Sequence, residues 1–338
     1  MSVRIVYGEE GVFDAVELLR HGGVVGLPTE TVYGLAGNAF DPLAIARIFE
    51  AKGRPLTDPL IVHLPEVSWI ERIVQFSSLE QQAIVVKLAE AFWPGPLTLL
   101  LPKHPELPEL VTAGSDQVAV RVTAHPLFQA ILHRLGSPLA APSANRFGRI
   151  SPTSASDVRI ELGESISLIL DGGPCEHGVE STIISIQGDH LGILRPGPIT
   201  IDQLKEYGHV SSLAGNMNTP GSLPGHYAPK KRLQIIDSDI LSLPPGGRVG
   251  LMAFNTSFKE IHEQYAAVEV LSLSGNLKEA AANFYGALRR LDQSNVDWIL
   301  AQPVPEKGIG VAIMDRLRRA SHGSSHGTGH QDSNSLLR

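Results

Sequence analysis

Short apolar runs rich in β-branched residues alternate with amphipathic segments over the first 208 residues of the chain. We expect strands over 24–27, 60–64, 97–101, 118–122, 138–142, 167–171 and 181–186. We expect helices over 12–22, 42–53, 79–92, 126–136 and 199–208. This alternation predicts an α/β domain over 1–208.

Capping residues support several of these helix boundaries. Asp41 followed by Pro42 suits an N-cap and a first-turn proline. Gly53, Gly136 and Gly208 stand where three of the helices should end.

The pattern changes after Tyr207, where Gly, Pro, Ser and Asn become frequent; we predict a linker over 209–232. A second alternating series follows, with strands expected over 232–236, 248–254, 268–273 and 296–301 and helices over 257–265, 276–293 and 308–320. It predicts a smaller Rossmann-like α/β/α domain over 233–320. The tail 321–338 is rich in His, Ser and Gly, and we expect it to be disordered.

Composition narrows the class of protein. A chain of 338 residues is longer than a single hydrophobic core usually supports, so two domains are expected. The formal charge of −7 gives no electrostatic reason to expect non-specific nucleic-acid binding. A single cysteine, Cys175, excludes an internal disulfide framework and a multi-cysteine zinc module. We see no signal peptide or membrane span, which predicts a cytoplasmic protein.

A pair of cations, Lys52 and Arg54, is the first candidate for chemistry. The chain has no Walker P-loop and no GxGxxG after a strand, so phosphates need discrete side chains. Both cations follow a predicted helix, where they could bind phosphate or neutralise the helix end, and taken alone the two alternatives are about equal. Pro55 restricts the backbone just after Arg54, which holds both cations in place and favours the phosphate-binding alternative.

Three later clusters are candidates for the opposite wall of one pocket. The segment 141–151 is dense in phosphate- and ribose-binding groups, although a turn that caps a helix near Pro152 explains it equally. Glu180, Ser181 and Thr182 open a strand, and Arg195 precedes a Pro-Gly turn. Arg121 lies within an apolar strand and needs a carboxylate partner, from the protein or from a substrate.

The motifs PTETVYGL, KGRP with DPLIVH, FWPGPLT, VAVRV, APSAN, GVEST and LRPG occur in this order. Together they resemble the YrdC-type threonylcarbamoyl-AMP synthases, and the linker motif HYAP with a trailing α/β domain is similar to the long, two-domain form. The resemblance implies a twisted mixed sheet with helices around a concave cavity. It also implies a reaction that converts L-threonine, bicarbonate or CO2, and ATP into L-threonylcarbamoyladenylate and pyrophosphate.

The resemblance also implies roles for particular residues. Arg121 would clamp the threonine carboxylate, and Lys52 and Arg54 would be the catalytic cations on the phosphates. The implied threonine-binding residues are Thr31, Tyr33, His63, Arg121, Ala141 and Ser181. The implied ATP-binding residues are Lys52, Arg54, Asp58, Ser143, Asn145, Ser151, Arg195 and Tyr227.

No protein ligand to a metal is firmly implied; Mg²⁺ is expected with ATP, with Asp58 near the triphosphate. Tyr227 of HYAP could close over the triphosphate, whereas a passive tether is the simpler role for the linker. The linker has Ser222 where similar proteins commonly carry methionine, which leaves its contacts open. The C-terminal domain receives no catalytic residue. Its candidate roles are anchoring the lid, docking a partner and dimerisation.

The expected partners are small-molecule substrates and the threonylcarbamoyl-transferase machinery that modifies tRNA next to the anticodon; direct tRNA contact is possible but not required. Two alternatives stay open. A carbamoyltransferase would use carbamoyl phosphate, but such larger proteins add zinc-finger modules that one cysteine excludes. An RNA-binding module is disfavoured by the acidic charge.

Overall fold

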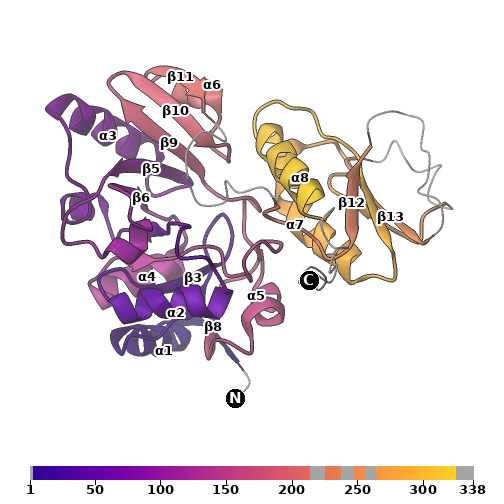
Figure 1. The fold of residues 1–338 in the computed structure, drawn as a ribbon, viewed down its shortest axis with the longest axis horizontal. Coiled ribbons are helices and arrows are strands. Elements are labelled where there is room, and N and C mark those ends of the chain that lie inside the picture. The colour runs from indigo at the N-terminus through magenta and orange to yellow at the C-terminus, as the bar shows by residue number, and fades with distance from the viewer. Residues whose placement is uncertain (1–2, 214–224, 237–246, 256–263, 325–338) are drawn as a thin grey trace, which may run out of the picture.

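The structure is a computed structural model of the 338-residue chain that describes residues 3–213, 225–236, 247–255 and 264–324. Figure 1 shows two bodies, an N-terminal domain built on a large sheet and a smaller C-terminal domain. The prediction of a mixed α/β domain followed by a second α/β domain is confirmed. Within the described residues no helix is long and apolar enough to cross a membrane.

An eleven-stranded mixed sheet forms the N-terminal domain, in the order β1-β8-β2-β3-β7-β4-β6-β5-β9-β10-β11. Its strands are β1 (Arg4–Tyr7), β2 (Val25–Leu27), β3 (Gly34–Asn38), β4 (Ile61–His63), β5 (Leu97–Pro102), β6 (Gln117–Arg121), β7 (Leu139–Ala140), β8 (Leu168–Asp171), β9 (Thr182–Gln187), β10 (His190–Arg195) and β11 (His209–Ser212).

Helices surround this sheet. They are α1 (Gly8–Arg20), α2 (Pro42–Lys52), α3 (Leu79–Phe92), α4 (Pro126–Leu135), α5 (Ala155–Leu162) and α6 (Ile201–Leu204), with 3-10 turns η1 (Val67–Arg72) and η2 (Glu109–Thr112).

The predicted capping residues behave differently at different helices. The Asp41 side chain accepts a hydrogen bond from the Leu43 amide at 2.9 Å, and Gly53 ends α2 in the left-handed region at φ 58°. Gly136 ends α4 in the same way. The helix expected up to Gly208 is shorter, because α6 ends at Leu204.

Four strands are missing from the sequence prediction: β1, β3, β10 and β11. Strand β3 consists of Gly, Leu, Ala and Asn, which have little strand preference as a group, and its pairing with β2 and β7 overrides that preference. Strand β11 falls within the predicted linker range 209–232, but it pairs parallel with β10 at the sheet edge. The polar sequence HVSS suits an edge, where one side faces solvent.

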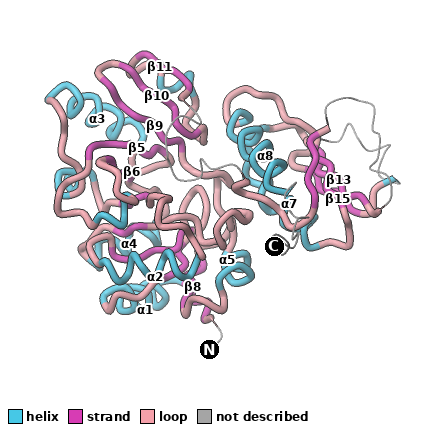
Figure 2. The backbone as a smooth tube through the Cα atoms, viewed as in Figure 1, coloured by secondary structure: helices cyan, strands magenta, loops and turns pink. Residues whose placement is uncertain are grey.

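The C-terminal domain contains a parallel four-stranded sheet in the order β12-β15-β13-β14. Its elements are β12 (Arg232–Ile235), β13 (Val249–Ala253), β14 (Ala267–Val270), β15 (Trp298–Ala301), α7 (Leu277–Gln293) and α8 (Gly310–Ser324). Figure 2 shows α7 and α8 between this sheet and the N-terminal domain. The helix predicted over 257–265 falls largely outside the described residues.

Helix α8 continues past the predicted boundary at residue 320 and ends at Ser324. The first residues of the predicted tail are therefore helical. The remainder of that tail, 325–338, lies outside the described residues, as does Ser222 of the linker.

The two domains share one hydrophobic cluster. Val32, Ile150 and Val179 of the N-terminal domain and Tyr227 of the linker pack with residues of α7 and α8, including Phe284, Leu288 and Leu317. A buried apolar seam of this kind holds the C-terminal domain against the loops that precede β3, α5 and β9.

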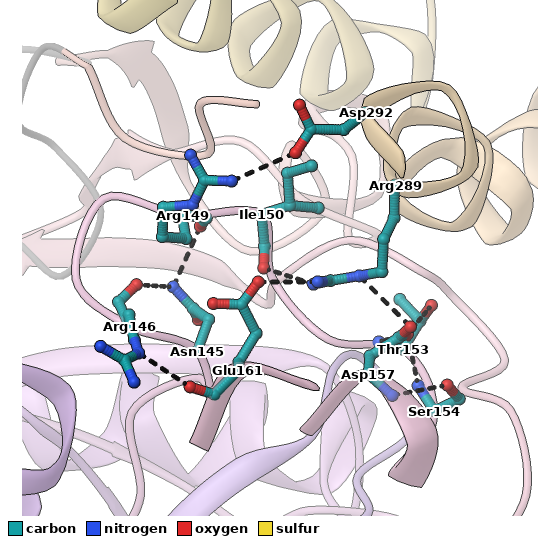
Figure 3. A network of polar contacts seen from close by, with 10 residues as sticks. All are labelled: Asn145, Arg146, Arg149, Ile150, Thr153, Ser154, Asp157, Glu161, Arg289 and Asp292. Carbon is teal, nitrogen blue, oxygen red and sulfur yellow. Dashed lines mark hydrogen bonds and ion pairs between the residues drawn. The ribbon is translucent and has the colours of Figure 1, made fainter. Parts of the chain in front are cut away.

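A polar network beside the cluster joins the same two domains (Figure 3). Arg289 of α7 lies 3.2 Å from Asp157 and 2.7 Å from Glu161, both on α5, and it donates to the Ile150 carbonyl at 2.8 Å. Arg149 pairs with Asp292 at 3.1 Å. These contacts fix where α7 sits over the 141–151 segment.

Candidate functional site

A cavity of about 50 Å³ lies where the loop after β2, the segment after β7, the start of β9 and the end of β10 meet the linker. Its free volume holds a few water molecules and is too small for ATP. The lining residues are Thr29, Thr31, Val32, Gly34, Arg54, Ile61, His63, Arg121, Ala141, Pro142, Ser143, Glu180, Ser181, Arg195, His226 and Tyr227.

One wall is organised around Arg121 at the end of β6, which is only 2% exposed. Its guanidinium group lies 3.0 Å from the Glu30 carboxylate and donates to the Thr31 hydroxyl at 3.3 Å. Thr123 also donates to Glu30. The carboxylate partner expected for Arg121 is therefore Glu30, an acid of the protein itself. Arg121 also lines the cavity beside Thr31.

His63 lies beside this wall, at the end of β4. Its ring stacks on Phe128 with 4.8 Å between centroids. Burial, reinforced by repulsion from Arg121, holds the pKa of His63 well below its usual value. The imidazole is therefore neutral at physiological pH and offers the cavity a hydrogen-bonding group without charge.

Ser181 and Arg195 form the next part of the lining. Arg195 donates to the Ser181 carbonyl at 3.1 Å and to the Ser181 hydroxyl at 3.0 Å. The same hydroxyl lies 2.8 Å from that of Thr98. The pairing of β10 with β9 thus brings the cation of the LRPG motif to the first residues of the GVEST strand.

Arg54 faces the cavity from the segment after α2. It donates to the carbonyls of Asp58 and Pro59 at 3.0 and 2.8 Å and pairs with the Asp58 carboxylate at 2.9 Å. Burial raises the pKa of Asp58 against the attraction of Arg54. Asp58 itself stands behind Arg54 and does not line the cavity.

Three other predicted ATP-binding residues lie behind the wall. The Lys52 ammonium group donates to the carbonyls of Ser143 and Asn145, and burial, reinforced by Arg54, holds its pKa well below the usual value. The Asn145 side chain donates to the Arg146 and Arg149 carbonyls. Ser151 donates to Glu180 at 2.6 Å. In this structure these groups support the lining loops.

Tyr33 is the predicted threonine-binding residue that the structure does not bring to the cavity. Its side chain is fully buried, and its hydroxyl donates to the Gly173 carbonyl at 2.8 Å and to Asp171 at 3.2 Å. Burial raises the pKa of this hydroxyl. Thr31, His63, Arg121, Ala141 and Ser181 do line the cavity together.

The linker closes the cavity with His226 and Tyr227, which are 7% and 3% exposed. Burial, with repulsion from Arg54 and Lys52, lowers the pKa of His226 to about 3. The Ala228 amide donates to the Gly148 carbonyl at 2.9 Å, which ties the linker to the APSAN loop. Tyr227 has φ 67°, a strained conformation for a residue with a side chain.

Several residues around the cavity were not among the predicted site residues. Glu30 and His226 lie inside recognised motifs, so their neighbours gave the only signal, and Glu180 was named only within the cluster that opens a strand. Tyr285 and Arg316 lie in α7 and α8, where they fit the pattern of an amphipathic helix and give no sign of a role in a site. Both reach Glu180. No pattern along the chain pairs residues so far apart.

The described residues contain no group of three or more His, Cys, Asp or Glu side chains that could hold a metal ion. Asp58, the one carboxylate predicted near the phosphates, is already paired with Arg54. The side chains of the described residues therefore do not fit a magnesium site built by the protein.

Comparison with known proteins connects this arrangement to a family. A family described as Telomere recombination matches residues 17–197, and the Threonylcarbamoyl-AMP synthase C-terminal domain matches residues 199–322. The threonylcarbamoyl-AMP synthase of Pyrococcus abyssi is 39% identical, over 91% of this chain and 93% of its own. The chain belongs to the threonylcarbamoyl-AMP synthase family. It is accordingly an enzyme of the nucleotidyltransferase type, as predicted.

Other relatives agree along the whole length. The threonylcarbamoyl-AMP synthase of Bacillus subtilis is also 39% identical, over 92% of this chain and 93% of its own. A crystal structure of Pyrococcus abyssi Sua5 complexed with L-threonine matches with a TM-score of 0.84 and 34% identity, covering 96% of this chain and 98% of that one. The predicted family and its two-domain form are confirmed.

Proposed function

We propose that this enzyme forms L-threonylcarbamoyladenylate and pyrophosphate from L-threonine, bicarbonate or CO2, and ATP, in the cytoplasm. The observation that carries the proposal is that Arg121, Thr31 and His63 line one cavity together with Arg54, Arg195 and Ser143. The threonine complex of the Pyrococcus abyssi relative supports the first substrate.

The threonine side is assigned to Thr31, His63, Arg121, Ala141 and Ser181. A guanidinium fork suits a carboxylate, and Glu30 holds that fork in place at 3.0 Å. Neutral His63 offers the amine of threonine a hydrogen-bonding group without charge, and the proton that this amine loses before it attacks CO2 passes to solvent. Tyr33 is tied to Gly173 and supports the loop from behind.

The ATP side is assigned to Arg54, Ser143, Arg195 and Tyr227, with Lys52, Asp58, Asn145 and Ser151 holding the loops that present them. The carbamate formed from threonine and CO2 attacks the α-phosphorus of ATP through one oxygen. A carbamate oxygen–phosphorus bond forms, and the bond from that phosphorus to the pyrophosphate oxygen breaks. Arg54 and Arg195 stabilise the charge that spreads over the phosphate oxygens.

Magnesium enters this proposal only as a companion of ATP, bound to the phosphates and water. The product is passed to the threonylcarbamoyl-transferase machinery that modifies tRNA next to the anticodon. Because ATP exceeds the free volume, His226 and Tyr227 move aside to admit it and return over the triphosphate.

One incubation tests the function. The full chain with ATP, magnesium, bicarbonate and threonine is expected to release pyrophosphate, and mass spectrometry is expected to detect the adenylate. Omission of threonine or bicarbonate should stop release. Pyrophosphate release without threonine, or none at all, contradicts the proposal. Activity with carbamoyl phosphate in place of bicarbonate and ATP supports the carbamoyltransferase alternative instead.

A further inference from the structure

Glu180 is a buried carboxylate on the cavity wall, and two of its three hydrogen-bond donors belong to the C-terminal domain. Ser151 donates to it at 2.6 Å from the N-terminal domain. The Tyr285 hydroxyl of α7 lies 3.0 Å from both carboxylate oxygens, and Nε of Arg316 in α8 donates at 3.0 Å. The C-terminal domain therefore reaches the lining of the cavity at this residue.

The position of Glu180 fixes its neighbours in the site. The next residue is Ser181, whose carbonyl and hydroxyl both accept from Arg195. A displacement of the Glu180 backbone moves the acceptors that orient the Arg195 guanidinium group. Arg316 and Tyr285 thus act on Arg195 through two intervening residues.

The same two side chains also support the linker. The Arg316 guanidinium carbon lies 5.5 Å from the centre of the Tyr227 ring, and the Tyr285 ring lies 5.8 Å from it. Tyr227 keeps a backbone conformation that is unfavourable for a residue with a side chain, so surrounding packing has to hold it. Arg316 and Tyr285 provide part of that packing.

The charges explain why a cation is needed at this point. Arg316 is fully buried and Glu180 is 5% exposed, so the pair is screened little by water. Without Arg316, the Glu180 carboxylate is left with Arg195 as the nearby cation of the cavity wall. It then competes with the phosphates for Arg195.

We propose that Arg316 and Tyr285 are positioning residues of the active site: they neutralise and hold Glu180, so that Arg195 stays directed at the phosphates and Tyr227 stays seated over them. The C-terminal domain thereby completes the phosphate side of the cavity. This inference rests on the proposed function, which assigns that side to ATP.

The simpler explanation is that Arg316 only docks one domain on the other. The explanations differ in which substrate responds and in the response to a second substitution. If Arg316 only docks the domains, its removal affects the kinetic parameters for ATP and for threonine alike. If Arg316 serves to neutralise Glu180, the loss falls mainly on ATP, and removing both charges restores much of it. If Arg316 touches ATP directly, the second substitution restores nothing.

The test compares Arg316→Met, Glu180→Gln, and the double variant Glu180→Gln with Arg316→Met in the full chain, by kcat and KM for ATP and for threonine. We expect Arg316→Met to lower kcat/KM for ATP by about 10- to 100-fold, the range for hydrogen bonds to charged groups. The threonine KM should change less than the ATP KM, because Arg121 and His63 are untouched and Ser181 is the one residue assigned to threonine that adjoins Glu180. The double variant should recover at least half of the loss on a logarithmic scale.

Two more variants complete the design. Tyr285→Phe keeps the ring and removes one donor, so we expect a loss smaller than that of Arg316→Met. Arg290→Met is the matched control, because Arg290 lies on α7, is exposed and pairs with Glu269 of its own domain. A double variant as poor as Arg316→Met, or equal losses for ATP and threonine, overturns the proposal.

Failure of this inference is distinguishable from failure of the proposed function. If the wild-type enzyme forms no adenylate, the proposed function fails. Hydrogen exchange of the Ala228 amide, which bonds to Gly148, then still reports on the seating of the linker. We expect faster exchange in Arg316→Met than in Arg290→Met. Equal exchange in both overturns the inference whatever the activity, and this readout also covers a variant that folds poorly, since global unfolding raises exchange at every buried amide.

Discussion

Two buried arginine–glutamate pairs border the cavity, and they differ in where their partners come from. Arg121 and Glu30 both belong to the N-terminal domain and lie 3.0 Å apart. Arg316 and Glu180 are also 3.0 Å apart, but they join two domains. Buried ion pairs add little stability relative to apolar residues of the same size. In the proposed function, the threonine side of the cavity is built by one domain and the phosphate side by two.

The largest effect should come from breaking the first pair. In Arg121→Met we expect kcat/KM for threonine to fall by about 30- to 4000-fold, because truncating one partner of a buried charge pair costs about 2–5 kcal/mol. Steady-state kinetics with varied threonine measures it. Arg20→Met, at an exposed pair with Glu17, is the control and should behave as wild type. A folded Arg121→Met enzyme with normal threonine KM would remove Arg121 from the threonine site.

A second test separates docking of the domains from the chemistry of the cavity. Arg289→Met leaves Asp157 and Glu161 without their buried partner, so the free energy of unfolding should fall by about 3 kcal/mol. Urea denaturation measures this change. Arg149→Met should cost about 1 kcal/mol or less, because Arg149 is 24% exposed. Losses of less than about 1 kcal/mol in both variants would show that the network in Figure 3 does not hold the domains.

The third test uses pH at the linker, where His226 and Tyr227 line the cavity. The pKa of His226 is about 3 when it is seated, compared with 6.5 for an unperturbed histidine. Between these values the released linker binds more protons than the seated one. The equilibrium constant for seating the linker is thus largest above pH 6.5. It falls as the pH falls, by up to about tenfold per pH unit.

Hydrogen exchange of the Ala228 amide at pH 7 and pH 5, corrected for intrinsic rates, measures this weakening. His226→Asn removes the titrating ring and should abolish most of the difference. If both proteins respond alike to pH, another group controls the linker, and Asp58, 3.8 Å from His226, is the next to replace.

The smallest effect is expected at Tyr33, behind the threonine side. Tyr33→Phe removes hydrogen bonds to Gly173 and Asp171, at a cost of about 1 kcal/mol in stability. Threonine KM should stay unchanged, since the hydroxyl does not face the cavity. A rise of about tenfold, equal to about 1.4 kcal/mol, would instead place Tyr33 in contact with threonine.

Much of this arrangement was predictable because it depends on local signals. Apolar periodicity located α3 and α7 closely, and Asp41 with Gly53 fixed both ends of α2. The position of Arg121 within an apolar strand predicted a buried partner carboxylate. The ordered motifs identified the family. In each case a few neighbouring residues carry the physical constraint, so the chain displays it directly.

Other features depended on groups that are distant along the chain. Sequence reasoning placed Lys52 with the phosphates, which stays a prediction, but it did not indicate that the ammonium group donates to the Ser143 and Asn145 carbonyls. It placed Tyr33 at threonine, yet β8 brings Asp171 and Gly173 to its hydroxyl. It read β11 as linker because an edge strand can be polar on its exposed side.

The sequence by itself determined the two α/β domains, the family and the cations that gather near the cavity, since propensity, capping and motif order are local. Only the tertiary structure decided that Glu30 is the partner of Arg121 and that Tyr285 and Arg316 hold Glu180 from the other domain. Such pairings depend on how helices and strands dock. Docking is set by the packing of whole surfaces, for which no short stretch of chain holds the information.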